Sequence, residues 1–187
     1  MERYVKVMFG TKSGASDFEY KLGEVNVSKI WNPKELNPQK MGGFNFSTES
    51  KILRWLVRGD TIYDVEIPFD AEVIDCPSNA SPHGVFRSNK IIMSNPRKVT
   101  DDMAMKLYLK SDLPEKSYYK AMAGCAVREY MNTALKIFDD KVNKENIKLV
   151  ILEFEDFCKH DVDEQFDENK HLNAKTRFIY DKLKELL

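Results

Sequence analysis

The pattern of apolar residues changes near Thr100, and this change constrains the fold more than any other feature of the chain. Before it, apolar and polar residues alternate, as in residues 63–67, which is the period of a half-buried strand. After it, apolar residues recur every three to four positions, as in amphipathic helices. We therefore predict an α+β protein with an antiparallel or mixed sheet in residues 1–98 and a helical half in residues 99–187.

The first half of the sequence predicts five strands separated by loops rich in glycine, proline and asparagine. The strands are expected at residues 4–9, 18–27, 63–67, 71–75 and 86–93. The loop at residues 32–43 has a length typical of functional loops. Ser47 or Thr48 is expected to cap a helix that runs to about Val57, because a hydroxyl can accept a hydrogen bond from an otherwise unpaired backbone N–H.

The second half of the sequence predicts four helices. Thr100 and the two aspartates after it indicate a helix start, because the hydroxyl can cap the backbone and the carboxylates favour the positive end of the helix dipole. One long helix is expected over residues 114–142, and Asn143 is expected to cap the next. An acidic connector at residues 159–170 leads to a final amphipathic helix. Its apolar stripe, which would dock on the domain or on a partner, consists of Leu172, Ile179, Leu183 and Leu186.

The composition argues against membrane and nucleic-acid partners. The chain has 29 Lys and Arg against 30 Asp and Glu, a net charge of −1, so no long-range field draws it to nucleic acid or to an anionic membrane. Its apolar stretches are far shorter than the ~20 residues of a membrane helix, and its start lacks the apolar segment of a signal peptide. We expect one cytoplasmic domain over residues 1–187.

The cysteines and histidines do not form a recognisable catalytic or metal-binding pattern. Cys76, Cys125 and Cys158 are an odd number without a close pair, so we expect reduced thiols, with Cys125 and Cys158 packed in the interior. His160 begins an acidic run that lacks the ligand spacing of a calcium loop. No serine or cysteine lies in a known nucleophile motif. These features predict no bound metal.

Two polar turns that contain glycine are candidate binding elements. One follows the first predicted strand, and the other lies at residues 42–48. Glycine allows a backbone to approach a ligand closely, and the backbone N–H groups can then bind an anion. The candidate ligand-binding residues in these turns are Gly10, Thr11, Ser13, Gly43, Phe44, Ser47 and Thr48. A tight turn and a helix cap would account for the same residues without any ligand.

A basic segment near the end of the first half supplies two further candidates, Arg87 and Lys90. Arg87 could contact a phosphate or carboxylate in a bidentate manner, and Lys90 could contact it as a point charge. His83 and the basic residues 97–98 lie close by in the sequence. A solvated strand edge protected by charge would also explain this segment. Binding to single-stranded nucleic acid is not expected, because exposed aromatic residues do not alternate with the basic ones.

The two turns together resemble part of the NAD pocket of ADP-ribosyltransferase-like folds. The resemblance rests on Phe-Gly-Thr at residues 9–11 and on Gly-Phe-x-Phe-Ser-Thr at residues 43–48, followed by a strand. It implies an enzyme that uses NAD and a glutamate, often in a Glu-x-Glu pair; Glu153 and Glu155 form such a pair here. However, Phe9 replaces the usual histidine. The apolar spacing around the pair also predicts a helix that turns both carboxylates toward solvent.

A second resemblance covers residues 42–113. Its motifs are the run at residues 43–48, Val-x-Ile-Pro at residues 65–68 and Phe-Arg-Ser-Asn-Lys-Ile-Ile at residues 86–92. These look like an uncharacterised module of giant DNA-virus proteins, where it often precedes ankyrin repeats, and of small phage proteins. Ankyrin signatures are absent from this chain. The resemblance implies a viral or phage accessory protein that binds host components.

Three functional hypotheses follow from the sequence. The first is a non-catalytic binding protein of viral or phage type that engages a small anionic ligand, such as a nucleotide, or a host protein through the two turns, Arg87 and Lys90, without a cofactor. The second is an ADP-ribosyltransferase-like enzyme that uses NAD. The third is a structural protein that forms homo-oligomers through its final helix.

Overall fold

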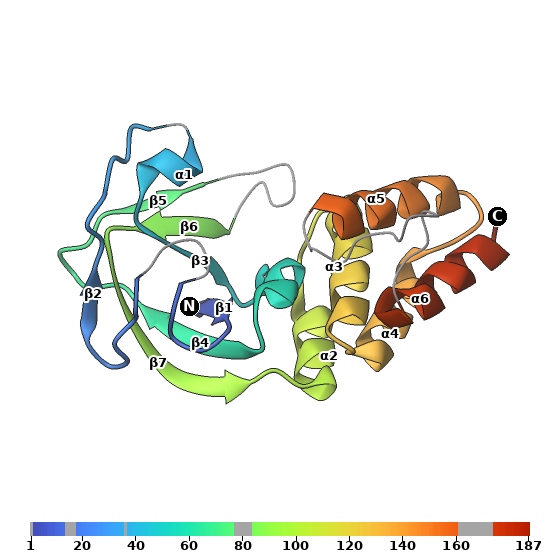
Figure 1. The fold of residues 1–187 in the computed structure, drawn as a ribbon, viewed down its shortest axis with the longest axis horizontal. Coiled ribbons are helices and arrows are strands. Elements are labelled where there is room, and N and C mark those ends of the chain that lie inside the picture. The colour runs from blue at the N-terminus through green and yellow to red at the C-terminus, as the bar shows by residue number, and fades with distance from the viewer. Residues whose placement is uncertain (1, 14–17, 36, 77–83, 161–173) are drawn as a thin grey trace. The chain divides into compact units, whose positions relative to one another are not determined.

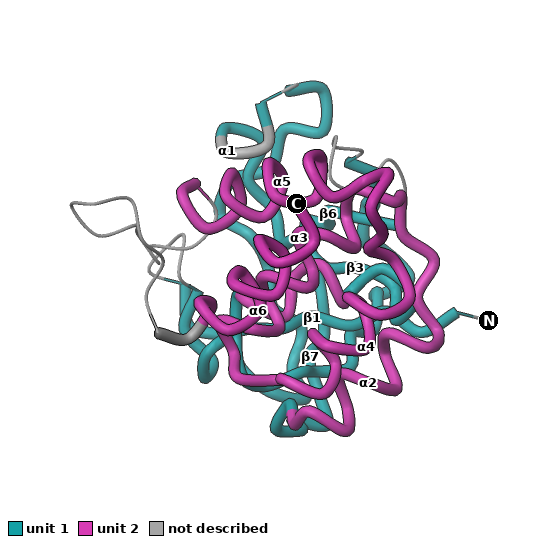
Figure 2. Tube along the Cα trace, turned by 90° about the vertical axis from the view of Figure 1, so that its right-hand side faces the viewer, with its two compact units in different colours: residues 1–52, 58–99 teal, residues 53–57, 100–187 magenta. Residues whose placement is uncertain are grey.

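The chain forms two compact units that match the two halves seen in the sequence. A computed structural model describes residues 2–13, 18–35, 37–76, 84–160 and 174–187. Unit 1 comprises residues 1–52 and 58–99 and contains the sheet, and unit 2 comprises residues 53–57 and 100–187 and contains the long helices (Figure 2). The predicted α+β class, with a sheet first and helices second, is confirmed.

Unit 1 is built on a seven-stranded sheet in which every pairing between strands is antiparallel (Figure 1). The strand order is β2-β7-β4-β1-β3-β6-β5, so β2 and β5 are the edges. The strands are β1 (Tyr4–Met8), β2 (Val25–Val27), β3 (Phe44–Thr48), β4 (Thr61–Glu66), β5 (Val73–Asp75), β6 (Val85–Ser88) and β7 (Lys90–Lys98). A short helix, α1 (Pro38–Met41), lies within the predicted loop at residues 32–43.

The predicted helix from Ser47 or Thr48 to Val57 is wrong. Residues 44–48 form β3, and a 3₁₀ helix, η1 (Ile52–Arg58), follows. The residues of β3 alternate between the two faces of the sheet, and the aromatic side chains Phe44 and Phe46 are 4% and 3% exposed. Burying these two aromatic rings outweighs the tendency of the following hydroxyls to cap a helix.

The strand predicted at residues 86–93 is two strands. β6 ends at Ser88 and β7 begins at Lys90, and the Ser88 hydroxyl donates to the Lys90 carbonyl at 2.7 Å across this tight turn. β7 also continues through Pro96 to Lys98. Proline fits there because this end of β7 pairs with β4 alone, and the register shift beside Asp64 indicates a bulge.

Aromatic side chains dominate the core of unit 1. Tyr4 meets the rings of Phe46 and Phe86 edge-on at 5.2 and 5.4 Å between centroids. At the other end of β3, Phe18 and Tyr20 pack on Phe44 at 4.8 and 5.3 Å. The segment predicted as a strand at residues 18–27 reaches strand geometry only at β2, but its first part supplies these two rings to the core.

Unit 2 is a bundle of helices. The helices are α2 (Asp101–Lys110), α3 (Glu115–Val127), α4 (Met131–Lys141), α5 (Ile147–His160) and α6 (Ala174–Glu185). Cys125 and Cys158 are fully buried, as predicted. Residues 53–57 of η1 belong to this unit: Leu53 is 1% exposed, and the Arg54 guanidinium lies 4.7 Å from the centroid of the Phe157 ring.

The single helix predicted over residues 114–142 is two helices. α3 ends at Val127 because Glu129 adopts a left-handed conformation with φ of 63°, and the Tyr130 amide donates to the Cys125 carbonyl at 2.8 Å. This is the hydrogen-bond pattern of a Schellman termination, which glycine usually supplies. A glutamate at this position gave no signal in the sequence.

The last two helices differ partly from expectation. Asn143 precedes α5, and its side-chain oxygen accepts from the amides of Glu145 and Asn146 at 2.9 and 3.0 Å, as expected of a cap. The apolar stripe of α6 is used within unit 2, since Ile179 and Leu183 are fully buried. Most of the predicted acidic connector and Leu172 lie outside the described residues.

Thr100 provides a direct test of the predicted helix start. Its hydroxyl accepts from the Met103 amide at 3.2 Å, and Asp101 follows in the first turn of α2. Thr100→Ala is therefore expected to lower the free energy of unfolding of unit 2 by about 1 kcal/mol. Thr100→Ser, which keeps the hydroxyl, should lose much less in the same urea titration. Equal losses in both variants would contradict the cap.

Candidate anion site

The first glycine turn is occupied by contacts within unit 1. The Gly10 carbonyl accepts from the Tyr63 hydroxyl at 2.9 Å, and the Thr11 hydroxyl donates to the Glu19 carboxylate. The Ser13 amide donates to the Phe18 carbonyl at 2.9 Å. Together with the bond from the Tyr20 amide to the Thr11 carbonyl at 2.8 Å, these bonds hold Phe18 and Tyr20 beside residues 11–13. The turn thus positions aromatic rings, and its Ser13 amide already has a partner.

The glycines of the second turn serve close packing of the backbone. Gly43 donates its amide to the Ile30 carbonyl at 2.9 Å and to the Ser28 hydroxyl at 3.1 Å. A Cβ atom on Gly43 would lie 2.6 Å from the Trp31 ring, so only glycine fits against this indole. The Gly43 amide is therefore not available to a ligand, contrary to the role expected for this turn.

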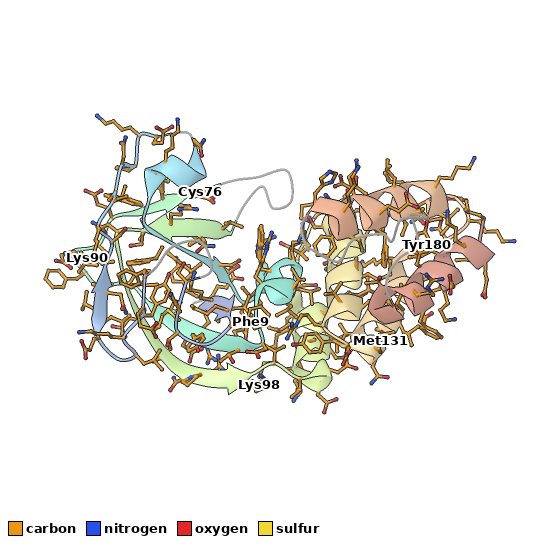
Figure 3. All side chains as sticks on the ribbon, in the orientation of Figure 1. Phe9, Cys76, Lys90, Lys98, Met131 and Tyr180 are labelled. Carbon is orange, nitrogen blue, oxygen red and sulfur yellow. The ribbon has the colours of Figure 1, made fainter. Side chains whose placement is uncertain are left out.

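Of the five remaining candidate residues, Phe44 is buried in the core of unit 1, and the other four lie in three places. Ser47 and Thr48 lie at the far end of β3, where the Ser47 hydroxyl donates to the Gly84 carbonyl at 2.7 Å. Lys90 forms an ion pair with Asp70 at 2.5 Å. Figure 3 shows Lys90 at the start of β7, apart from the labelled Cys76 at the end of β5. Arg87 is the candidate cation that remains near the Gly42–Gly43 turn, because its Nη1 donates to the Gly42 carbonyl at 2.7 Å.

The Arg87 side chain is held in place by a hydrogen bond, but no carboxylate of the described chain neutralises its charge. Its side chain projects from β6 beside Asn45 of β3, with which it pairs in register, and it is partly exposed. Within the described part of the chain, the Arg87 side chain makes no ion pair with a carboxylate, and its one hydrogen bond goes to a neutral carbonyl. A guanidinium has five N–H donors. Most donors of Arg87 therefore remain for an external acceptor.

Lys6 is a second cation at this place, and the sequence did not single it out. β1 and β3 pair at Tyr4 and Val5 and then separate, while β1 continues alongside β4. The Thr48 amide donates to the Gly84 carbonyl at 3.3 Å, on the side of β3 that faces β6. Because the backbone groups of successive strand residues point to opposite sides, those of Asn45 point toward β1. The Lys6 Nζ fills the gap: it donates to the backbone and side-chain oxygens of Asn45 at 2.6 and 2.7 Å.

The Lys6 ammonium lies among apolar and aromatic groups. Its side chain is 8% exposed, and Nζ lies 5.6 Å from the centroid of the Tyr20 ring. Burial, and to a smaller extent the nearby Arg87 guanidinium, lower the pKa of Lys6 to about 7. Within the described residues, its hydrogen-bond acceptors are carbonyl oxygens and not carboxylates.

Arg87 also affects the other titratable groups around it. Burial raises the pKa of the Tyr20 phenol, and the positive charge of Arg87 partly opposes this rise. The same two effects act on the Cys76 thiol, whose pKa is raised by burial and lowered in part by Arg87. The Cys76 sulfur lies 3.9 Å from the Met41 sulfur. A thiol with a raised pKa is a poor nucleophile, so Cys76 does not indicate covalent catalysis.

We define the anion site as Lys6, Tyr20, Asn45 and Arg87 with the Gly42 carbonyl. Arg87 was predicted from the sequence as a candidate, whereas Lys6, Tyr20 and Asn45 were not. The one signal for Lys6 was Met8, which lies on the same face of β1. Met8 is apolar, as are Val5 and Val7 on the opposite face, and apolar residues on both faces indicate a strand that is buried on both sides. Tyr20 appeared only as part of a possible strand, and nothing marked Asn45.

Glu153 and Glu155, the glutamates expected to act in an ADP-ribosyltransferase-like reaction, lie in unit 2 and are not part of the anion site. Both are on helix α5, as their spacing predicted, but they do not simply face solvent. The Glu153 carboxylate pairs with Lys116 at 3.2 Å and Lys120 at 3.4 Å, and Glu155 accepts from the Tyr180 hydroxyl. The Glu153 side chain is only 14% exposed. These contacts join α5 to α3 and α6 within unit 2. The expectation of a solvent-facing carboxylate is therefore wrong for Glu153, whereas the Glu155 side chain is 35% exposed.

Comparisons with known proteins give no family assignment. No protein family matches the chain, and no curated protein or solved structure is significantly similar to it. In the part of the chain that the structure describes, no three His, Cys, Asp or Glu side chains are grouped to hold a metal ion. None of the described helices has the length and apolar character needed to cross a membrane. His83, one of the basic-segment residues, lies outside the described residues.

Proposed function

We propose that this protein is a non-catalytic binding protein for a small anionic ligand that carries phosphate groups, such as a nucleotide, and that Arg87 makes the main contact. One observation carries the proposal: two neighbouring cations, Arg87 and Lys6, are each held by carbonyl oxygens and lack a carboxylate partner in the described chain. Because buried or half-buried cations are usually paired, an unpaired couple favours an external anion.

The two cations would act differently on the ligand. Arg87 is partly exposed, so its planar guanidinium can reach a phosphate and donate two parallel hydrogen bonds. Lys6 is nearly covered and would act mainly through its charge, which is felt strongly in apolar surroundings of low dielectric constant. An anion would in turn favour the charged form of Lys6. Binding is therefore expected to take up a proton near neutral pH.

The other hypotheses receive less support from these contacts. An ADP-ribosyltransferase-like reaction requires a glutamate beside the ligand, whereas Glu153 and Glu155 are engaged by Lys116, Lys120 and Tyr180 in unit 2. Oligomerisation through α6 would need its apolar stripe, of which Ile179 and Leu183 are fully buried within the chain. A viral or phage origin and binding of a host protein remain predictions from the sequence.

The test is calorimetric titration with pyrophosphate, ADP and adenosine. Pyrophosphate and ADP should bind and adenosine should not, because the proposed contacts are to phosphate. Arg87→Gln is expected to weaken binding at least about tenfold, since a charged hydrogen-bonding partner contributes about 1.5–3 kcal/mol. Arg97→Gln is the matched control, because the Arg97 guanidinium already pairs with Asp64 at 2.5 Å.

Two outcomes would overturn the proposal. One is that neither pyrophosphate nor ADP binds to the wild-type protein. The other is that Arg87→Gln and Arg97→Gln bind as tightly as each other and as the wild type. Circular dichroism of both variants establishes that they are folded before the titration.

A further inference from the structure

The edge strand β2 leaves backbone hydrogen-bonding groups open on its outer side. The Ser28 amide donates to the Asn89 carbonyl at 2.9 Å, and Asn26 lies opposite Ile91 of β7. In an antiparallel ladder the bonded positions alternate, so Ser28 and Asn26 face β7 whereas Val25 and Val27 turn their N–H and C=O groups away. No hydrogen bond to the backbone of Val25 or Val27 occurs in the described chain outside the ladder with β7.

The side chains along this edge are apolar and exposed. Val25 and Val27 are 50% and 53% exposed, and Leu22 and Ile30 at the two ends of the segment are 41% and 64% exposed. Open edges on monomeric proteins are usually protected by charge, proline or a covering element. Here four apolar side chains border the open backbone groups, which is typical of a strand that pairs with another chain.

The sequence around β2 is complementary to itself. If two copies of β2 lie antiparallel about a two-fold axis through Asn26, Val25 of each copy faces Val27 of the other. All four outward valine backbones then form hydrogen bonds. The same arrangement brings Leu22 of each copy toward Ile30 of the other.

We propose that β2 pairs with β2 of a second copy of this chain and joins two sheets into one across a two-fold axis. The self-complementary apolar side chains favour a second copy over an unrelated peptide, because one contact surface serves both partners. The pairing is independent of the anion site. It also differs from the expected oligomerisation through the final helix, which would use the stripe that contains the buried Ile179 and Leu183.

The dimer is expected to be weak. β2 has three residues, and such a contact buries less than the roughly 1,200–2,000 Å² of a stable interface. Sedimentation velocity of the full chain between about 5 and about 500 µM, a range suited to micromolar affinity, should show a reversible shift from monomer to dimer. A wild-type protein that stays monomeric, or forms a species larger than a dimer, overturns the proposal.

Paired substitutions test the register. Val25→Lys with Val27→Lys places like charges opposite each other in both halves of the contact and should weaken dimerisation at least about tenfold. Val25→Glu with Val27→Lys places opposite charges there and should restore it. Both variants change only exposed side chains. Unchanged dimerisation in the first variant, or no recovery in the second, overturns the proposed pairing.

A control on the other edge of the sheet completes the experiment. Val73 of β5 is also an apolar edge residue, 39% exposed. Val73→Lys should leave dimerisation as in the wild type, because β5 takes no part in the proposed contact. A loss of dimer in Val73→Lys equal to that in the double-lysine variant would show that charge anywhere on unit 1 disrupts association, and it would overturn the assignment to β2.

Discussion

Gly42→Ala is expected to lower the free energy of unfolding of unit 1 by about 3–5 kcal/mol. Gly42 has φ of +75°, where an L side chain is strained, and a Cβ atom there would lie 2.1 Å from the Ile30 carbonyl oxygen and 2.6 Å from its carbon. The obstacle is backbone that is itself hydrogen-bonded to Gly43 at 2.9 Å. The chain would have to move, and the Arg87 anchor on the Gly42 carbonyl would move with it.

Gly23 provides a matched control for this substitution. Its φ is +74°, almost the same as that of Gly42, but a Cβ atom there would meet nothing within 4 Å. Gly23→Ala should therefore cost only the conformational strain, about 1–2 kcal/mol. Urea unfolding followed by the fluorescence of Trp31, in a Trp55→Phe background, reports on unit 1 because Trp55 belongs to unit 2. Similar losses in the two alanine variants would contradict the close packing of Gly42 on Ile30.

Lys6 is expected to make the stability of unit 1 rise with pH between about 7 and 9, by about 2 kcal/mol in total. The pKa of Lys6 is about 7 in the folded chain, against 10.5 for the free side chain. Between these values the unfolded chain holds a proton that the folded chain has lost. Unfolding then takes up a proton, so raising the pH disfavours unfolding.

The contribution of Lys6 is isolated by comparing three proteins. Urea unfolding at several pH values gives the slope for the wild type, for Lys6→Met and for Lys98→Met. Lys6→Met should lose the rise, whereas Lys98→Met should keep it, because the Lys98 side chain is 68% exposed and pairs with Asp60 at 2.6 Å. Other groups titrate alike in the three proteins and cancel in the comparison. A wild-type curve parallel to that of Lys6→Met would show that the amine keeps an ordinary pKa.

The sequence predicted the larger elements well because their patterns depend on local burial. Alternation identified β4, and the capping hydroxyl of Thr100 identified the start of α2. The predictions from the sequence failed where the backbone adopts a conformation that is unusual for the residue type at that position. Glu129 in the left-handed region ends α3, and Asn95, with φ of 50°, lies in the bulged part of β7. Such positions are set by tertiary packing rather than by local preference.

The candidate site was predictable only in part for a related reason. Arg87 stood out because basic residues cluster around it. Lys6 did not, because a lysine between two apolar residues in a strand reads as a solvated position. It is buried because β1 and β3 separate after two paired positions, and a change in strand pairing far along the chain cannot be read from residues 4–8. The glycine turns were identified, but the sequence did not reveal that Gly42 and Gly43 pack closely on Ile30 and Trp31.

The membership of residues 53–57 in unit 2 has a consequence for how the protein is made and how it can be cut. During synthesis, Arg54 and Val57 leave the ribosome well before the residues that they contact in unit 2, Phe157 of α5 and Gly124 of α3. A fragment that starts at Thr100 would lack these side chains and should expose the apolar surface that they cover. A single cut or gene fusion at residue 99 therefore cannot transfer the complete helical unit. Its evolution is tied to that of residues 53–57, which lie within the sheet half of the sequence.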